Sequence, residues 1–218
     1  MSTVRHPAPP AQPIRLYCHP LSGHAHRVEL FLSLLGLPSE QIHVDLLSGA
    51  QKAPAFLAKN PFGEVPVIED DDRTIADSNA ILVYLARRYD PSGAWLPSSP
   101  EDAAAVQRWL SVAAGELVQG PAGARIEVLF SRPRDPKRPQ VAARLFGVLD
   151  AHLATCPFLV GERPTIADVS LYTYSAHAPE GGISLSPYPH LRAWLARVEA
   201  LPGFVGMQRN ADAEPLAS

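Results

Sequence analysis

Apolar and polar residues in the first part of the chain follow two different spacings. Ile14 to Cys18 alternates between the two kinds and predicts a strand. The i, i+3, i+4, i+7 spacing of Val28, Phe31, Leu32 and Leu35 predicts an amphipathic helix. This helix begins at Ser22 or Gly23 and ends at Gly36. Residues 42–46 predict a second strand, and residues 54–57 predict a short helix or an irregular turn.

A hairpin followed by a helix completes this part. Val65 to Ile68 is a β-branched run, Thr74 to Ala76 is its predicted partner, and Asp70 to Asp72 form a polar turn between them. Ser78 is predicted to cap the next helix, whose apolar positions are Ile81, Tyr84 and Leu85. The predicted order of elements is therefore β-α-β-α-β-β-α, an α/β domain over residues 14–90.

The second half of the chain reads as helical throughout. Residues 91–100 contain three prolines and no periodicity, which is typical of a linker. Three segments after it have apolar residues at helical spacing, and Ser99 is predicted to cap the first of them. The apolar positions are Val106, Trp109, Leu110, Ala113 and Leu117 in the first segment, Val141, Leu145, Val148, Leu149 and Leu153 in the second, and Leu191, Trp194, Leu195, Val198 and Leu201 in the third. Thr165 to Asp168 resembles a capping box. We therefore predict an all-helical domain over residues 101–218.

Composition narrows the class of protein. The chain has 218 residues, 46% of them hydrophobic and 19% charged, with a net charge of −3 and no basic patch that would favour nucleic acid. No apolar run reaches the roughly 20 residues that span a bilayer. Residues 1–13 hold four prolines and are predicted to be a mobile tail, with neither a signal peptide nor an anchor. Cys18 and Cys156 lie far apart and indicate neither a disulfide framework nor a metal site, which favours the cytoplasm.

Asp77 and Ser78 stand where a predicted strand ends and a helix begins. A helix N-terminus presents unpaired N–H groups and partial positive charge, which suit a carboxylate. The Asp77 side chain could accept a hydrogen bond from an ammonium group. A ligand with a free amino-acid head group would satisfy both, although plain capping is the simpler role for such residues.

Several motifs occur in an order that resembles one family. They are Leu16-Tyr-Cys-His-Pro-Leu-Ser22 with Arg27-Val28, then residues 60–66, Asp77-Ser-Asn-Ala-Ile81 and Thr165-Ile-Ala-Asp168. Together they resemble the cytosolic glutathione S-transferases, in particular phi- or theta-like bacterial members of the serine type. The resemblance implies a thioredoxin-like N-terminal domain, a helical C-terminal domain that forms part of the electrophile site, and a homodimer. It also implies glutathione as co-substrate and no metal.

The resemblance implies a role for each matching residue. Ser22 would donate a hydrogen bond to the glutathione sulfur. The bond between Val65 and Pro66 would be cis, and the Val65 backbone would pair with the cysteinyl part of glutathione. The remaining implied contacts are the γ-glutamyl group with Asp77 and Ser78, and the glycyl carboxylate with Gln51 and Lys52.

Some positions depart from the family pattern. Asp77 is one methylene shorter than the usual glutamate, Glu64 replaces a common glutamine, and Gln51 replaces a common histidine. His24, in the first turn of the predicted helix, could also face the sulfur. These departures bear on the activity more than on the fold.

Three functions stay open from the sequence. The first is conjugation of glutathione to small apolar electrophiles, with Ser22 stabilising the thiolate. The second keeps glutathione but reduces peroxides or isomerises a substrate, whereas thiol exchange is disfavoured because residue 22 has no sulfur. The third is a non-catalytic module that binds a ligand or a protein, since fold alone does not fix function.

Overall fold

The computed structural model describes residues 10–209 and divides them into two compact units. One unit comprises the residues up to Ser98 together with Leu201–Met207, and the other contains Ser99–Ala200. Most of the predicted mobile tail, residues 1–9, lies outside the described residues. The hydrophobic pattern does not indicate that Leu201–Met207 belongs to the first unit. This segment is fastened by the Ser33 hydroxyl, which donates to the Gly203 carbonyl at 2.6 Å.

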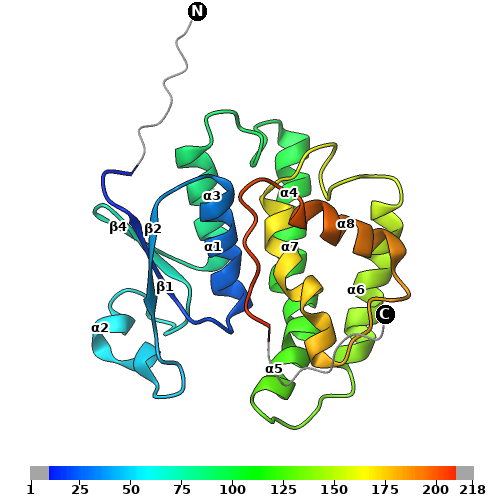
Figure 1. Ribbon diagram of the computed structural model, residues 1–218, viewed down its shortest axis with the longest axis horizontal. Helices are drawn as coiled ribbons and strands as arrows, with labels where there is room; N and C mark the ends of the chain where they lie inside the picture. Colours follow the sequence, from blue (N-terminus) through cyan, green and yellow to red (C-terminus); the bar gives the residue numbers. More distant parts are fainter. Residues whose placement is uncertain (1–9, 210–218) are drawn as a thin grey trace, which may run out of the picture. The chain divides into compact units, whose positions relative to one another are not determined.

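A four-stranded mixed sheet forms the centre of the first unit, in the order β2-β1-β3-β4 (Figure 1). β1 pairs in parallel with β2, and the other two pairings are antiparallel. The elements are β1 Ile14–Cys18, α1 Gly23–Leu34, β2 Ser39–His43, η1 Ala50–Lys52, α2 Pro54–Leu57, β3 Val67–Asp70, β4 Arg73–Ala76 and α3 Ser78–Tyr89. The predicted β-α-β-α-β-β-α order and the thioredoxin-like fold are confirmed.

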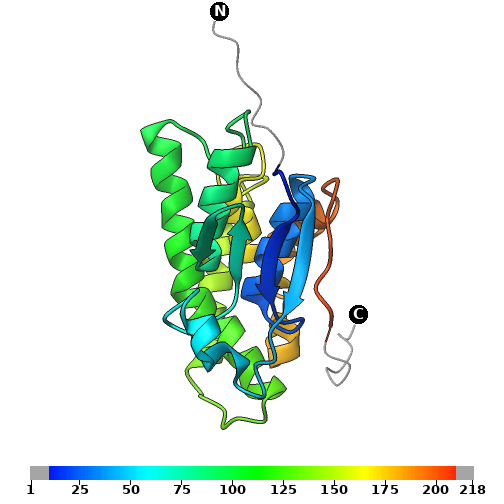
Figure 2. The same cartoon turned by 90° about the vertical axis from the view of Figure 1, so that its left-hand side faces the viewer.

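The two faces of the sheet are covered by different helices. Ile14, Leu16 and Cys18 of β1 are buried on the face that α1 and α3 cover, as alternation along a strand requires. On the other face, Tyr17 stacks edge-on against Phe56 of α2 at a ring separation of 6.2 Å. Figure 2 faces the sheet, with β1 and β2 in blue.

The second strand lies earlier in the chain than its β-branched residues predict. We expected it at residues 42–46, whereas β2 is Ser39–His43, paired from Ile14↔Ser39 to Cys18↔His43. The Asp45 carboxylate accepts from the backbone N–H groups of Leu47 and Ser48 at 3.0 and 3.1 Å. Asp45 therefore fixes a turn, and the strand has to end before it.

Helices make up the second unit. They are α4 Pro100–Ala114, the π-helical turn η2 Val118–Ala122, α5 Gly123–Leu129, α6 Arg138–Leu153, α7 Ile166–Ala176, η3 Ala178–Gly181 and α8 Pro189–Glu199. The predicted Ser99 cap of α4 is confirmed, since its hydroxyl accepts from the Asp102 N–H at 3.1 Å. One predicted core position is wrong: Val148 is 49% exposed, because α6 turns it to the polar side of the helix. Among the described helices, none is long and apolar enough to cross a membrane.

Candidate active site

A cavity of about 520 Å³ opens in the first unit, a size typical of small-molecule sites. Three segments that are distant in sequence line it. They are His24 of α1, six residues of the loop 60–66 before β3, and Ala76 to Ser78 where β4 meets α3. The sheet brings these segments together because the loop and the β4–α3 junction lie at the same end of the hairpin.

The loop 60–66 is held in shape by its own polar groups. Asn60 is buried, and its side chain donates to the Glu64 carbonyl at 2.8 Å and accepts from the Phe62 N–H at 3.1 Å. Gly63 has a φ of +59°, and a Cβ there would lie 2.7 Å from the Gln51 carbonyl oxygen, so the position requires glycine. The Val65–Pro66 bond is cis, as the resemblance predicts.

Asp77, and not Ser78, caps α3. The Asp77 carboxylate accepts from the Ala80 N–H at 2.8 Å, and Ser78 is the first residue of the helix. Asp77 adopts a φ of +74°, which directs its side chain back over the first turn. The predicted Ser78 cap is therefore wrong by one residue. The correction frees the Ser78 hydroxyl for another role.

That hydroxyl lies between two side chains of α1. Ser78 and Arg27 are both buried, and the Arg27 Nη1 donates to Ser78 Oγ at 2.7 Å and to Asn79 Oδ1 at 3.0 Å. Nδ1 of His24 lies 3.3 Å from the same Ser78 oxygen. His24 thus lines the cavity and contacts the start of α3, where Asp77 and Ser78 form the predicted site for an amino-acid head group.

His24 is electrically neutral in this position. Burial, and then the nearby Arg27 charge, lower the pKa of the imidazole from 6.5 to about 3. A neutral ring can donate from only one of its nitrogens and accept at the other. The positive charge behind this wall of the cavity is therefore that of Arg27.

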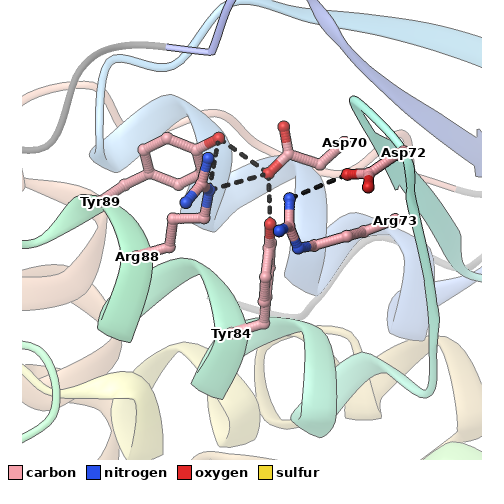
Figure 3. A network of polar contacts seen from close by, with 6 residues as sticks. All are labelled: Asp70, Asp72, Arg73, Tyr84, Arg88 and Tyr89. Carbon is pink, nitrogen blue, oxygen red and sulfur yellow. Dashed lines mark hydrogen bonds and ion pairs between the residues drawn. The ribbon is translucent and has the colours of Figure 1, made fainter.

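A buried carboxylate ties α3 to the sheet (Figure 3). Oδ2 of Asp70, at the end of β3, accepts from the hydroxyls of Tyr84 at 2.6 Å and Tyr89 at 2.7 Å, and Nε of Arg88 lies 3.6 Å from it. Burial and this carboxylate raise the pKa of both tyrosines. The network fixes the axis of α3 and therefore the place of its first residues.

Ser22, Gln51 and Lys52 are not among the residues that line the cavity. The hydroxyl of Ser22 caps α1 by accepting from the Ala25 N–H at 3.2 Å. Nζ of Lys52 donates to the Phe62 carbonyl at 2.8 Å, so this lysine holds the cavity-lining loop from behind. The Gln51 amide donates to the Leu46 carbonyl at 3.4 Å.

Cys18 is unsuited to thiol chemistry. It is buried in β1, and burial, with a smaller effect of Glu29, raises the pKa of its thiol to about 11. Reactive cysteines are exposed and carry a lowered pKa. Cys18 therefore packs as a small apolar side chain, as its place in the strand predicts.

Arg27 and Asn60 make contacts at this site that the sequence pattern did not reveal. Arg27 lies one position before Val28 and four before Phe31, inside the stripe that packs on the sheet. A charged residue on a buried stripe needs a partner, and this is the signal that could have singled it out. Its partner, however, lies 51 residues away in sequence.

Comparisons with known proteins agree with this architecture. The family models "Glutathione S-transferase, N-terminal domain" and "Glutathione S-transferase, C-terminal domain" match residues 12–87 and 133–202. Glutathione S-transferase 3 of Zea mays is 34% identical over 94% of this chain and 96% of its own length. The chain belongs to the glutathione S-transferase family.

Solved structures give the same answer. A glutathione S-transferase from Pseudomonas fluorescens superimposes with a TM-score of 0.83 at 36% identity, over 90% of this chain and 99% of the other. A glutathione transferase homologue from Drosophila mojavensis, solved with bound glutathione, gives a TM-score of 0.79 at 28% identity, over 87% and 89% of the two chains.

Proposed function

We propose that this protein conjugates glutathione to small apolar electrophiles. The glutathione sulfur, as a thiolate, attacks an electrophilic carbon, a carbon–sulfur bond forms, and the leaving group departs with the electron pair of the broken bond. Neither a metal nor a covalent bond to the protein is needed for this step. The reaction requires only that the thiol be ionised and aligned.

The observation that supports the proposal is the polar start of α3 on the cavity wall. Asp77 and Ser78 both line the cavity, beside the N-terminus of a helix of 12 residues. A helix N-terminus and a serine hydroxyl suit the γ-glutamyl carboxylate, and the Asp77 carboxylate suits the ammonium group. Glutathione carries both groups on one carbon. In this proposal Val65 and Pro66 face its cysteinyl part, and Gln51 and Lys52 serve its glycyl carboxylate.

Ser22 is the proposed thiolate stabiliser. A serine hydroxyl that accepts a hydrogen bond from the helix still has its own hydrogen to donate, so capping α1 and holding a sulfur are compatible roles. Lowering a thiol pKa of about 8.5 by two units takes roughly 2.7 kcal/mol. A hydrogen bond to a charged group gives about 1.5–3 kcal/mol, and a helix N-terminus gives about 0.3–1 kcal/mol. The two together suffice.

Replacing Ser22 by alanine tests this role. We expect the pKa of enzyme-bound glutathione, followed by the ultraviolet absorbance of the thiolate, to rise by about one to two units, with turnover falling about 10- to 100-fold. Glutathione affinity should change little. Ser22→Thr, which keeps a hydroxyl, is the matched control. Unchanged turnover in Ser22→Ala would remove Ser22 from the mechanism and make His24 the next candidate.

Two further expectations belong to this proposal. A homodimer is expected from the family, and light scattering of the purified chain tests it. The cytoplasmic location expected from the cysteines stays a prediction, which microscopy of a tagged chain tests.

Assays with a panel of electrophiles and peroxides test conjugation against the peroxidase alternative.

A further inference from the structure

The hydroxyl of Ser78 has its hydrogen-bonding direction set from inside the protein. A guanidinium group only donates, so in the 2.7 Å contact with Arg27 the Ser78 oxygen must accept. A serine hydroxyl has one hydrogen of its own. This hydrogen cannot point at Arg27, and the residue lines the cavity. Two acceptors are open to it: Nδ1 of His24, 3.3 Å away on the cavity wall, when that nitrogen carries no hydrogen, and a ligand oxygen in the cavity. In both cases the hydroxyl donates on the cavity side.

The charge of Arg27 also favours an anionic ligand at the Ser78 hydroxyl. Arg27 is 1% exposed, so water screens its charge little. A hydroxyl that accepts from a cation is polarised and becomes a better donor. An anionic oxygen bound by Ser78 would thus meet a strengthened donor with a buried positive charge behind it.

Arg27 also fixes where the hydroxyl stands. Its Nη1 holds Ser78 and Asn79, the first two residues of α3, while its backbone belongs to α1. His24, three residues earlier on the same helix, places Nδ1 3.3 Å from the same Ser78 oxygen. Two side chains of α1 therefore bracket one hydroxyl of α3.

We infer that Arg27 is a positioning residue for the α-carboxylate of the γ-glutamyl group, acting through the hydroxyl of Ser78. This inference rests on the proposed function, because it takes glutathione as the ligand. It adds a residue outside the cavity lining to the recognition of one particular carboxylate. It predicts that Arg27 matters only for ligands that carry that group.

The test measures binding of two ligands by calorimetry. One is glutathione, and the other is γ-aminobutyryl-cysteinylglycine, which is glutathione without the α-carboxylate. Arg27→Met keeps most of the side-chain length and removes the charge and the donors. We expect it to weaken glutathione about tenfold or more and to leave the analogue within about twofold of its affinity for the unmutated protein.

Controls separate positioning from general damage. Asn79→Ala removes the other acceptor of the Arg27 Nη1 and leaves Ser78 in place, so glutathione affinity should stay within about twofold. Ser78→Ala and the double variant with Arg27→Met should bind glutathione equally weakly, because both lack the donor. If Arg27→Met does not fold, Arg27→Lys permits the same comparison, with a partial loss for glutathione alone.

The outcomes distinguish the two proposals. If the unmutated protein does not bind glutathione, or binds the analogue equally well, the proposed function or its carboxylate site fails. If the unmutated protein discriminates but the Arg27 variants weaken both ligands by the same factor, Arg27 is merely structural and the inference is overturned. Loss confined to glutathione supports it.

Discussion

The helices α3 and α7 both begin with an aspartate and a hydroxyl side chain. At α7 the protein itself satisfies the aspartate, whereas at α3 the two residues line a cavity. At α7, Oδ1 of Asp168 accepts from the Leu159 N–H and the Trp194 Nε1, each at 2.9 Å. Its Oδ2 accepts from the backbone N–H of Thr165 at 2.8 Å, and the residue is 1% exposed. At α3, Asp77 is exposed and makes one cap contact, and Ser78 faces a cavity.

The difference separates a structural cap from a binding site. The Thr165 hydroxyl also donates to Oδ2 of Asp168, at 3.2 Å, so each carboxylate oxygen accepts two hydrogen bonds from the protein and none is left for a ligand. Burial raises the pKa of this carboxyl. Asp77 and Ser78 keep hydrogen-bonding capacity on the side of the cavity. Aspartate with serine or threonine at a helix start is therefore ambiguous until its partners are counted.

Removing Asp168 should have the largest effect on the protein. Asp168→Ala leaves the Leu159 N–H, the Thr165 N–H and the Trp194 indole without their acceptor. We expect the free energy of unfolding to fall by about 3–5 kcal/mol, measured by denaturant titration. Ser99→Ala, at an exposed cap, should cost only about 1 kcal/mol. A loss as small as that for Asp168→Ala would contradict the contrast between the two helix starts.

Removing the Asp77 charge should affect binding and spare stability. Asparagine caps helices as well as aspartate does, so Asp77→Asn keeps the contact with Ala80 and loses only the charge. We expect glutathione to bind about 10- to 100-fold more weakly, by calorimetry, with an unchanged melting temperature.

The alanine variant separates the two roles of this side chain. Asp77→Ala should show the same loss of glutathione affinity and, in addition, lose about 1 kcal/mol of stability with the cap. Wild-type affinity in both variants would mean that the ammonium group of the ligand lies elsewhere.

The last predicted effect concerns His24 and pH. Its pKa is about 3 in the folded protein and 6.5 in an unfolded chain, so between these values the unfolded chain binds more protons. Stability should therefore rise with pH through this window and decline as acid is added. Denaturation of the unmutated protein and of His24→Gln at about pH 7 and about pH 4.5 measures this, and the variant should lose less in acid. Equal losses in both proteins would show that His24 is not held neutral.

Local patterns in the sequence predicted most of the fold. The spacing of apolar residues predicted α1 and the buried stripe of α4. For residues 54–57 a short helix and an irregular turn both stayed open, and the structure has the helix α2. The position of β2 was missed because its residues are mostly polar and exposed, and pairing with β1 selects them. A strand that packs few apolar side chains leaves little periodic signal.

The site was predictable in part. Asp77 and Ser78 do line a cavity. Which of the two caps α3 depends on the positive φ of Asp77, and the residue type does not reveal that angle. Arg27 was missed for a different reason. Its contact with Ser78 joins two helices through the folded sheet, and no local pattern encodes such a pair.

The most direct test is a crystal structure of the protein with glutathione. The account predicts the γ-glutamyl α-carboxylate within hydrogen-bonding distance of the Ser78 hydroxyl, the ammonium group beside Asp77, and the sulfur next to Ser22 Oγ. A tripeptide bound in the reverse direction, or outside the cavity formed by His24, the loop 60–66 and the start of α3, would contradict it.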